Sequence, residues 1–228
     1  MVVLDALHAI QAGQAGDLAV RWNCKAGRCG SCSAEINGKP RLLCMARMES
    51  FEHGETVTVA PLRAFPVIRD LVTDVSSNYR KAAQIPPFTP GPAAADDSRR
   101  IMQEDVDRIR EFHNCIECFL CQDTCHVIRD HPEHAASFAG PRFFARLAAL
   151  EMHPLDRADR VPAIKDGAGI DLCNITGCCT EVCPEKIRIT DNAIIPLKER
   201  VADRYHDPAA KFFGWFSNRA NREEGDED

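Results

Sequence analysis

The sequence predicts an α+β protein in two parts, a small mixed unit over about residues 1–65 and an all-α second half. Two patterns predict this division: short β-type segments follow one amphipathic helix in the first part, and apolar residues recur at helical spacing in the second. A third observation concerns chemistry, because the chain has 12 cysteines and they fall into three groups with different spacings.

The first part begins with a predicted helix and continues with short strands. The helix is marked by apolar residues at helical spacing: Val3, Leu4, Leu7 and Ile10. Extended segments are expected over residues 18–22, 33–36, 41–43 and 56–59. The dipeptide Asn37-Gly38 joins the second and third of them, and it is a strong hairpin signal. The cysteines that precede this hairpin therefore lie in one tight loop.

A helix and a linker are predicted between the two parts. Proline suits the first turn of a helix, and Pro66 precedes an apolar stripe formed by Val67, Ile68, Leu71, Val72 and Val75. We expect this helix to bridge the two parts. Residues 85–98 are too rich in proline, alanine and small polar residues for regular structure, so they indicate a linker.

The second half is predicted to be helical around its cysteines. One helix is marked by Met102, Val106, Ile109 and Phe112. Another follows Gly140-Pro141 and is marked by Phe143, Phe144, Leu147 and Leu150. A last helix carries Leu197 and Val201, with Asp191 as its candidate N-cap and Pro196 in its first turn or breaking it.

Composition excludes several functions and gives the cysteines a context. The formal net charge of −6 argues against nucleic acid as a partner, because phosphate binding needs a cationic surface. No apolar stretch is long enough to span a membrane, and the first residues lack the zones of a secretion signal. We therefore expect a cytoplasmic location, where thiols bind metal or do redox chemistry and do not form structural disulfides. The acidic end, residues 223–228, is expected to be a disordered tail.

The first cysteine group has the plant-type spacing of a 2Fe-2S protein. Cys24, Cys29 and Cys32 follow the pattern CxxxxCxxC, and Cys44 lies downstream to complete four thiolate ligands. Gly27 and Gly30 allow backbone amides to approach the cluster closely. We predict a 2Fe-2S cluster on these four cysteines.

The second group has the run of a bacterial ferredoxin, whose last cysteine serves a different cluster. Its first three members and a distant Cys-Pro predict a 4Fe-4S cluster held by Cys115, Cys118, Cys121 and Cys183. By reciprocity Cys125 joins Cys173 and Cys179 in the third group.

The third group lacks one thiolate. A complete cubane site would have a cysteine at position 176, but the residue is Thr176, so we predict a 3Fe-4S cluster on Cys125, Cys173 and Cys179. Cys178 is out of register, and we interpret it as a buried structural thiol pointing elsewhere. The alternative is a 4Fe-4S cluster that recruits Cys178.

Other functions find less support. Zinc sites also use CxxC pairs, two for each ion. A zinc site would not explain why the second and third cysteine groups each need a cysteine from the other. The histidines near the second group are interpreted as solvated or as neighbours of ligands: His113, His126, His131 and His134. No nucleophile with a base and no Walker or GxGxxG loop is present, so no side chain is assigned to catalysis. A late aromatic run forms core or docks a membrane partner, and we prefer docking: Phe212, Phe213, Trp215 and Phe216.

Taken together, these motifs resemble the iron-sulfur subunit of succinate dehydrogenase and fumarate reductase. The resemblance is carried by CKAGRCGSC at 24–32, Cys44, CIECFLCQDTC at 115–125 and CNITGCCTEVCP at 173–184. It implies a β-grasp 2Fe-2S ferredoxin-like domain over residues 1–65 and a bridging helix and linker over 66–100. It further implies an α-helical ferredoxin-like domain over residues 101–218, with two interleaved cubane-type sites, followed by the tail at 219–228.

The resemblance also implies a function and partners. Electrons would pass from the FAD of a flavoprotein subunit through the 2Fe-2S, 4Fe-4S and 3Fe-4S clusters to quinone at a membrane anchor, as succinate is oxidised to fumarate. The chain would lie at the cytoplasmic face of the membrane with no transmembrane segment of its own. The alternatives are fumarate reduction, or the iron-sulfur subunit of another quinone-linked dehydrogenase.

The sequence departs from the family in three places. Met1 falls at the first helix, where the family has a strand hairpin before it, so we expect the first hairpin to be missing. His126 occupies a position that is often proline, and residues 127–130 lack the tryptophan found beside ubiquinone in many members. Asn174 occupies the position of a quinone-site histidine in some members. These changes suggest menaquinone bound mainly by an anchor that carries haem b.

Overall fold

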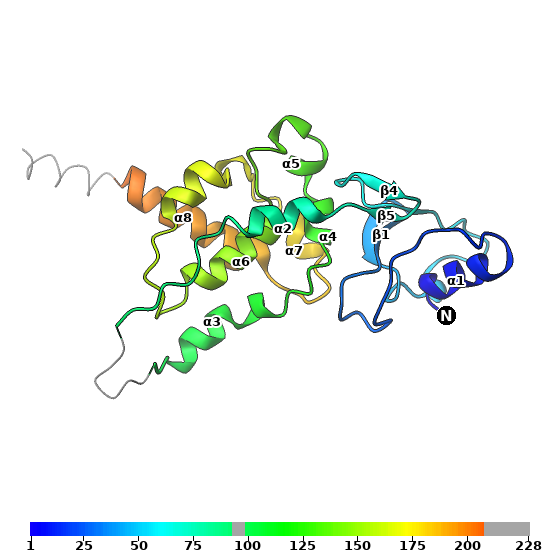
Figure 1. Ribbon diagram of the computed structural model, residues 1–228, viewed down its shortest axis with the longest axis horizontal. Coiled ribbons are helices and arrows are strands. Elements are labelled where there is room, and N and C mark those ends of the chain that lie inside the picture. The colour runs from blue at the N-terminus through cyan, green and yellow to red at the C-terminus, as the bar shows by residue number, and fades with distance from the viewer. Residues whose placement is uncertain (93–98, 208–228) are drawn as a thin grey trace, which may run out of the picture.

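The computed structural model describes residues 1–92 and 99–207. The strands lie at one end of the long axis and the longer helices of the second half at the other (Figure 1). The aromatic run at residues 212–216 and the acidic tail at 219–228 lie outside the described residues.

The N-terminal part is a short helix packed beside a small antiparallel sheet. Helix α1 (Val3–Gly13) buries Val3, Leu4 and Leu7, as its apolar spacing predicts. Strands β1 (Ser33–Ile36) and β2 (Lys39–Leu42) form the predicted hairpin, and β3 (Val59–Ala60) pairs with the other edge of β1. Asn37 and Gly38 have φ values of 49° and 72°, because a two-residue hairpin turn of this twist needs positive φ at both positions.

Two strand predictions in this part are wrong in extent. Only Val59 of the predicted strand at 56–59 lies in β3. Thr58, just before β3, still contacts the β1–β2 turn, because the Asn37 N–H donates to its carbonyl. Residues 18–22 form no strand. A short 3-10 turn, η1 (Met48–Ser50), follows the last cysteine of the first group.

The predicted helix beginning at Pro66 is wrong. The segment forms a small hairpin of β4 (Val67–Arg69) and β5 (Val72–Thr73), and a helix begins only at α2 (Ser76–Ala82). β-Branched residues favour strands, and Asp70 adopts a left-handed φ of 47° in the turn. The turn is tied to the extended segment beside it, because Asp70 accepts the Ala19 N–H at 2.7 Å and the Leu71 N–H donates to the Ala19 carbonyl. The predicted apolar stripe is divided: Val67 and Ile68 are 55% and 63% exposed, whereas Leu71 and Val75 pack against the N-terminal core.

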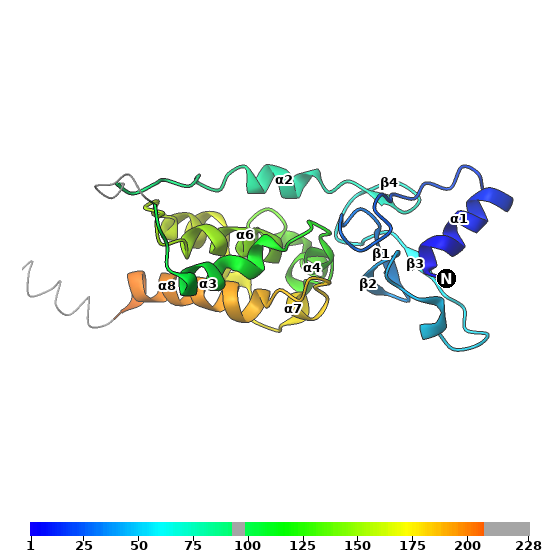
Figure 2. The same cartoon turned by 90° about the horizontal axis from the view of Figure 1, so that it is seen from below.

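The linker prediction is confirmed for residues 85–92, which form no helix or ladder and only an isolated bridge between Pro90 and Asp156. Together with α2, this stretch runs along one side of the helical part (Figure 2). Lys81 in α2 donates to the Ala135 and Phe138 carbonyls at 2.9 and 2.8 Å. Lys81 therefore links α2 to the second half through two hydrogen bonds.

The second half is helical over its described residues, as predicted. Its α-helices are α3 (Gln103–His113), α4 (Leu120–Asp123), α5 (His126–Arg129), α6 (Pro141–Glu151), α7 (Cys178–Glu181) and α8 (Ile195–His206). Short 3-10 turns are η2 (Pro132–His134) and η4 (Ile170–Leu172), and π-helical turns are η3 (Ala163–Gly167) and η5 (Ile189–Ile194).

The helices predicted at both sides of the second cysteine group are confirmed as α3 and α6. Ile109 and Phe112 of α3, and Phe144 and Leu147 of α6, are buried in the same core. Pro196 lies in the first turn of α8, one of the two positions that the sequence allowed for it. The predicted cap is wrong, because Asp191 lies inside η5 and the chain enters α8 already helical.

The two halves are joined by packing as well as by the chain. Phe119 and Leu120 from the second half are buried with the apolar residues of the N-terminal part. No helix of residues 1–92 and 99–207 is both long and apolar enough to cross a bilayer.

Candidate iron-sulfur cluster sites

The first cysteine group lies in a loop whose backbone amides face the sulfur atoms. The N–H groups of Ala26 and Arg28 point at Cys24 Sγ, with N–S distances of 3.4 and 3.2 Å, and that of Gly27 points at Cys44 Sγ at 3.3 Å. The Cys24 N–H points at Cys29 Sγ at 3.5 Å. Amide donors of this kind stabilise thiolates and tune the potential of a bound cluster.

The first four thiols also act on one another electrostatically. Burial, and after it the charges of Cys44 and Cys29, raises the pKa of Cys32 to about 12. Desolvation also acts on Cys29, but hydrogen bonds from Ser31 and the Cys24 backbone outweigh it and lower the pKa of Cys29 to about 6. The loop therefore brings Cys24, Cys29, Cys32 and Cys44 together, as the spacing predicts.

The second predicted set also converges. Burial raises the pKa of Cys118 to about 12, with smaller contributions from the charges of Cys115 and Cys183. Cys121 is fully enclosed, and burial together with the charges of Cys118, Cys115 and Cys183 raises its pKa. All four thiols line one largely apolar cavity, which Pro184, Ile187 and Ile189 help to close.

The third group contains four thiols rather than three. Burial raises the pKa of Cys125 to about 12, and the charges of Cys178 and Cys179 add to it. Burial raises the pKa of Cys179 to about 11, followed by the charges of Cys178 and Cys173. Cys178 is half-buried, and its thiol lies with the other three, although the sequence suggested that it points elsewhere.

The surroundings of the third group add two details that sequence reasoning missed. The Thr190 hydroxyl lies 3.3 Å from Cys179 Sγ, and the Thr176 hydroxyl lies 3.5 Å from Cys178 Sγ. Asn174 Nδ2 lies 2.6 Å from His126 Nε2, so two of the positions at which the sequence departs from the family contact each other. Of the remaining histidines near the second group, His113 is exposed, His131 precedes η2 and His134 ends it.

These residues fit iron-sulfur clusters. A buried thiol with a raised pKa stays protonated on its own, but cationic iron compensates for the loss of hydration and holds it as thiolate. The proposed ligands are all cysteine sulfurs, which are the usual ligands of iron-sulfur clusters. In addition, the second site is apolar, and the backbone amides of the first site point at its sulfur atoms; both features tune a bound cluster. Bound clusters would supply one-electron redox chemistry, and the chain would supply ligands, amide dipoles and exclusion of water.

Family comparison agrees with this division. Residues 1–80 match the 2Fe-2S iron-sulfur cluster binding domain, and residues 111–187 match the 4Fe-4S dicluster domain. The fold and the sites thus define an iron-sulfur protein with an N-terminal 2Fe-2S ferredoxin-like domain and a C-terminal 4Fe-4S domain.

Individual relatives narrow the class. The chain is 34% identical to the fumarate reductase iron-sulfur subunit of Mycobacterium tuberculosis over 190 residues, which cover 81% of this chain and 75% of that one. It is 33% identical to a subunit of the fumarate reductase (CoM/CoB) of Methanothermobacter marburgensis, covering 87% of this chain but only 38% of that longer relative.

A solved structure is more similar still. The Mycobacterium smegmatis Sdh1 complex in the apo form contains a chain 65% identical to this one, with a TM-score of 0.88 and coverage of 91% of this chain and 87% of that one. This chain belongs to the family of fumarate reductase and succinate dehydrogenase iron-sulfur subunits. It is accordingly an electron-transfer subunit of an oxidoreductase.

Proposed function

We propose that this chain relays electrons from the FAD of a flavoprotein subunit to membrane quinone as succinate is oxidised to fumarate. The carriers are a 2Fe-2S cluster on the first four cysteines, a 4Fe-4S cluster on the second set and a 3Fe-4S cluster on Cys125, Cys173 and Cys179. The observation that carries the proposal is a succession of contacts. Gly30 of the first loop packs on the backbone of Cys118, and the charge of Cys179 reaches Cys121 on the other side.

This succession supports a relay because single electrons move efficiently only between centres that lie close together. The second group contacts the first through the backbone, and its Cys121 interacts electrostatically with Cys179 of the third. The cluster of the second group would therefore be the middle carrier. The two sites are interleaved in sequence, since Cys183 serves the second and Cys125 the third.

The partners follow from the family. We propose a flavoprotein subunit, a membrane anchor that carries haem b, and menaquinone near the third cluster, with the chain at the cytoplasmic face of the membrane. Asn174 supports the choice of quinone, because it occupies the position of a quinone-site histidine in some members, and here it contacts His126. Fumarate reduction is the second candidate, supported by the names of two relatives. Another quinone-linked dehydrogenase remains the third.

We also propose a β-grasp architecture for residues 1–65 and a separate helical domain over residues 101–218. The antiparallel hairpin beside α1 supports the first, and the cysteine-lined helical core supports the second. Residues 66–100 would connect them, and the described part of this range up to residue 92 holds a hairpin, α2 and an extended stretch.

Electron paramagnetic resonance of the anaerobically purified complex tests the cluster assignment. Oxidised 3Fe-4S clusters are paramagnetic, whereas oxidised 2Fe-2S and 4Fe-4S clusters are silent, so the oxidised complex should give one iron-sulfur signal, distinct from any signal of ferric haem in the anchor. Thr176→Cys should abolish that iron-sulfur signal by completing a cubane site, and the matched variant Thr176→Ser should retain it. An oxidised spectrum of the unmodified complex without an iron-sulfur signal contradicts the assignment.

Cys178 needs its own variant, because its thiol lies with the third group. Under the proposed three-thiolate assignment, Cys178→Ala leaves the oxidised signal and the iron and sulfide content unchanged. Loss of the signal or of iron in Cys178→Ala makes Cys178 a ligand. Zinc without iron and acid-labile sulfide would contradict the electron-transfer function itself.

A further inference from the structure

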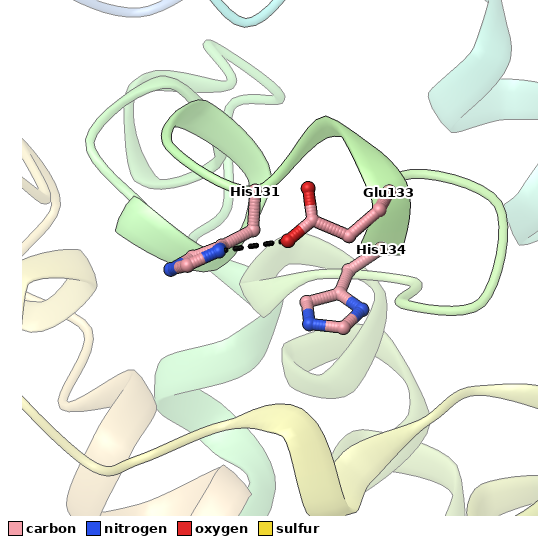
Figure 3. A group of neighbouring side chains, drawn as sticks. All are labelled: His131, Glu133 and His134. Carbon is pink, nitrogen blue, oxygen red and sulfur yellow. Dashed lines mark hydrogen bonds and ion pairs between the residues drawn. The ribbon is translucent and has the colours of Figure 1, made fainter.

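A second kind of metal-binding group lies away from the cysteines, on the turn that follows α5. His131, Glu133 and His134 each offer one ligand atom, and these atoms all lie within 4.8 Å of one another. Figure 3 shows the Glu133 carboxylate turned towards the His131 ring, with the His134 ring beside them. We propose that these three side chains bind one Zn²⁺ ion or a similar borderline divalent cation at the surface.

The donor set selects this class of ion. Two imidazoles and one carboxylate suit Zn²⁺ and its neighbours Ni²⁺ and Cu²⁺, whereas Ca²⁺ and Mg²⁺ prefer oxygen ligands throughout. Three protein ligands leave a coordination position for water, as in open zinc sites.

The backbone of the turn is fixed before any ion binds. Pro132 lies at the start of η2, and the His134 N–H donates to the His131 carbonyl at 2.9 Å. On the far side, the Phe138 N–H donates to the His134 carbonyl at 2.9 Å, and Lys81 Nζ donates to the Ala135 carbonyl. The entropy cost of assembling the ligands is therefore mostly side-chain entropy.

The side chains are free to complete the geometry. Ligand atoms of a tetrahedral zinc lie about 3.3 Å apart, as follows from Zn–N bonds of about 2.0–2.1 Å. His131 and Glu133 side chains are 51% and 60% exposed, and they already contact each other at 3.0 Å. A rotation of the exposed side chains closes the remaining gap.

The charge of the group also favours a cation. Hydrogen bonds from the Glu133 backbone N–H and from His131 lower the pKa of Glu133, so the carboxylate is ionised at neutral pH. An ionised carboxylate beside two imidazoles attracts a divalent cation.

Isothermal titration of the intact, cluster-loaded complex with Zn²⁺ tests the proposal, using protein without a polyhistidine tag and dialysed against chelator. The unmodified complex should bind roughly one more zinc per chain than the His131→Ala/His134→Ala variant. The matched control is His53→Ala/His113→Ala, which removes two exposed histidines elsewhere and should bind zinc as the unmodified complex does. Equal zinc binding by the His131→Ala/His134→Ala variant and the unmodified complex overturns the proposal.

X-ray absorption at the zinc edge identifies the ligands independently of affinity. A nitrogen and oxygen shell without sulfur is expected, and a sulfur shell would place zinc on cysteines and overturn the proposal. Iron and sulfide content checks that each variant retains its clusters.

Discussion

Gly30 is the residue at which the first cysteine loop touches the second. Its φ is 67°, and a Cβ atom there would lie 2.6 Å from the Ile116 carbonyl oxygen and 2.8 Å from Cys118 Cα. Both the backbone conformation and the close approach therefore require glycine. The distance between the first two proposed clusters depends on this missing side chain.

Gly30→Ala should push the two loops apart and slow electron transfer between them. We expect a destabilisation of about 1–3 kcal/mol from strain and overpacking together, and slower reduction of the second cluster in rapid-freeze spectra. The matched control is Gly38→Ala, because Gly38 also has a positive φ of 72° but no atom within 4 Å of the point that a Cβ would occupy. If both variants slow the transfer equally, contact with Cys118 is not the cause.

The sequence predicts which cysteines gather in each group, because iron-sulfur sites are defined largely by local spacing. The ligand sets of the clusters stay predictions. The sequence could not place Cys178. Whether that thiol turns towards Cys125 depends on Gly177, whose left-handed φ of 80° sets the start of α7, and on how that turn meets a segment about 50 residues away. Such a contact leaves no periodic signal.

Among the elements, the hairpin β4–β5 shows how a helical spacing can mislead. Its apolar residues repeat as in a helix, but they are mostly β-branched, and the decisive contacts are made by Asp70 and Leu71 with Ala19, far away in sequence. By contrast, α3 and α6 were predictable, because their apolar stripes face a core formed within the second half itself.

A buried cation helps to hold the extended stretch before residue 93. Arg160 has a fully buried side chain, and it donates to the Pro86 and Pro87 carbonyls at 2.9 and 2.8 Å and to Asp156 at 2.7 Å. Backbone hydrogen bonds also link the segment to the helical part, because the Gly91 N–H donates to the Leu155 carbonyl and the Arg157 N–H donates to the Thr89 carbonyl. Arg160 adds the buried charge to these links.

Arg160→Ala should cost about 3–5 kcal/mol of unfolding free energy, because it leaves a buried carboxylate and two carbonyls without their donor. Arg204→Ala is the matched control: its pair with Asp159 is 44% and 53% exposed, so it should cost at most about 1 kcal/mol. Urea denaturation of both variants measures the difference. Comparable costs would mean that Arg160 contributes only as a surface ion pair does.

The same contact predicts an acid dependence. Burial alone would raise the pKa of Asp156, but hydrogen bonds from Ala158, Thr89 and Arg160 lower it overall. A carboxyl whose pKa is lower in the folded state stabilises the protein above about pH 4 and loses that effect as the pH falls. The stability gap between unmodified protein and Arg160→Ala should therefore narrow below about pH 4.

At the scale of the whole molecule, the two halves share part of one apolar core. Phe119 lies between Phe65 and Tyr79, with ring centroids 6.2 and 5.5 Å away. Polar contacts also join the two halves: Asp123 accepts the Ala64 N–H at 2.9 Å, and buried Glu35 pairs with Arg129 as well as with Arg63 of its own half. The sequence alone could not predict this docking, because nothing in the spacing of these residues distinguishes an interface residue from a core residue of its own half.

Phe119→Ala should uncouple the halves. Loss of a buried phenyl ring costs about 3–5 kcal/mol, and here the cost falls on the interface between the halves. The two halves should therefore unfold at separate temperatures, the first followed by the absorbance of its cluster and the second by helical circular dichroism. Phe138→Ala is the matched control, because Phe138 is as deeply buried but packs only within the second-half core, against Phe144. It should lower stability without separating the two transitions. If Phe119→Ala still unfolds in one step, with iron content intact, the polar contacts of Glu35 and Asp123 suffice to hold the clusters in line.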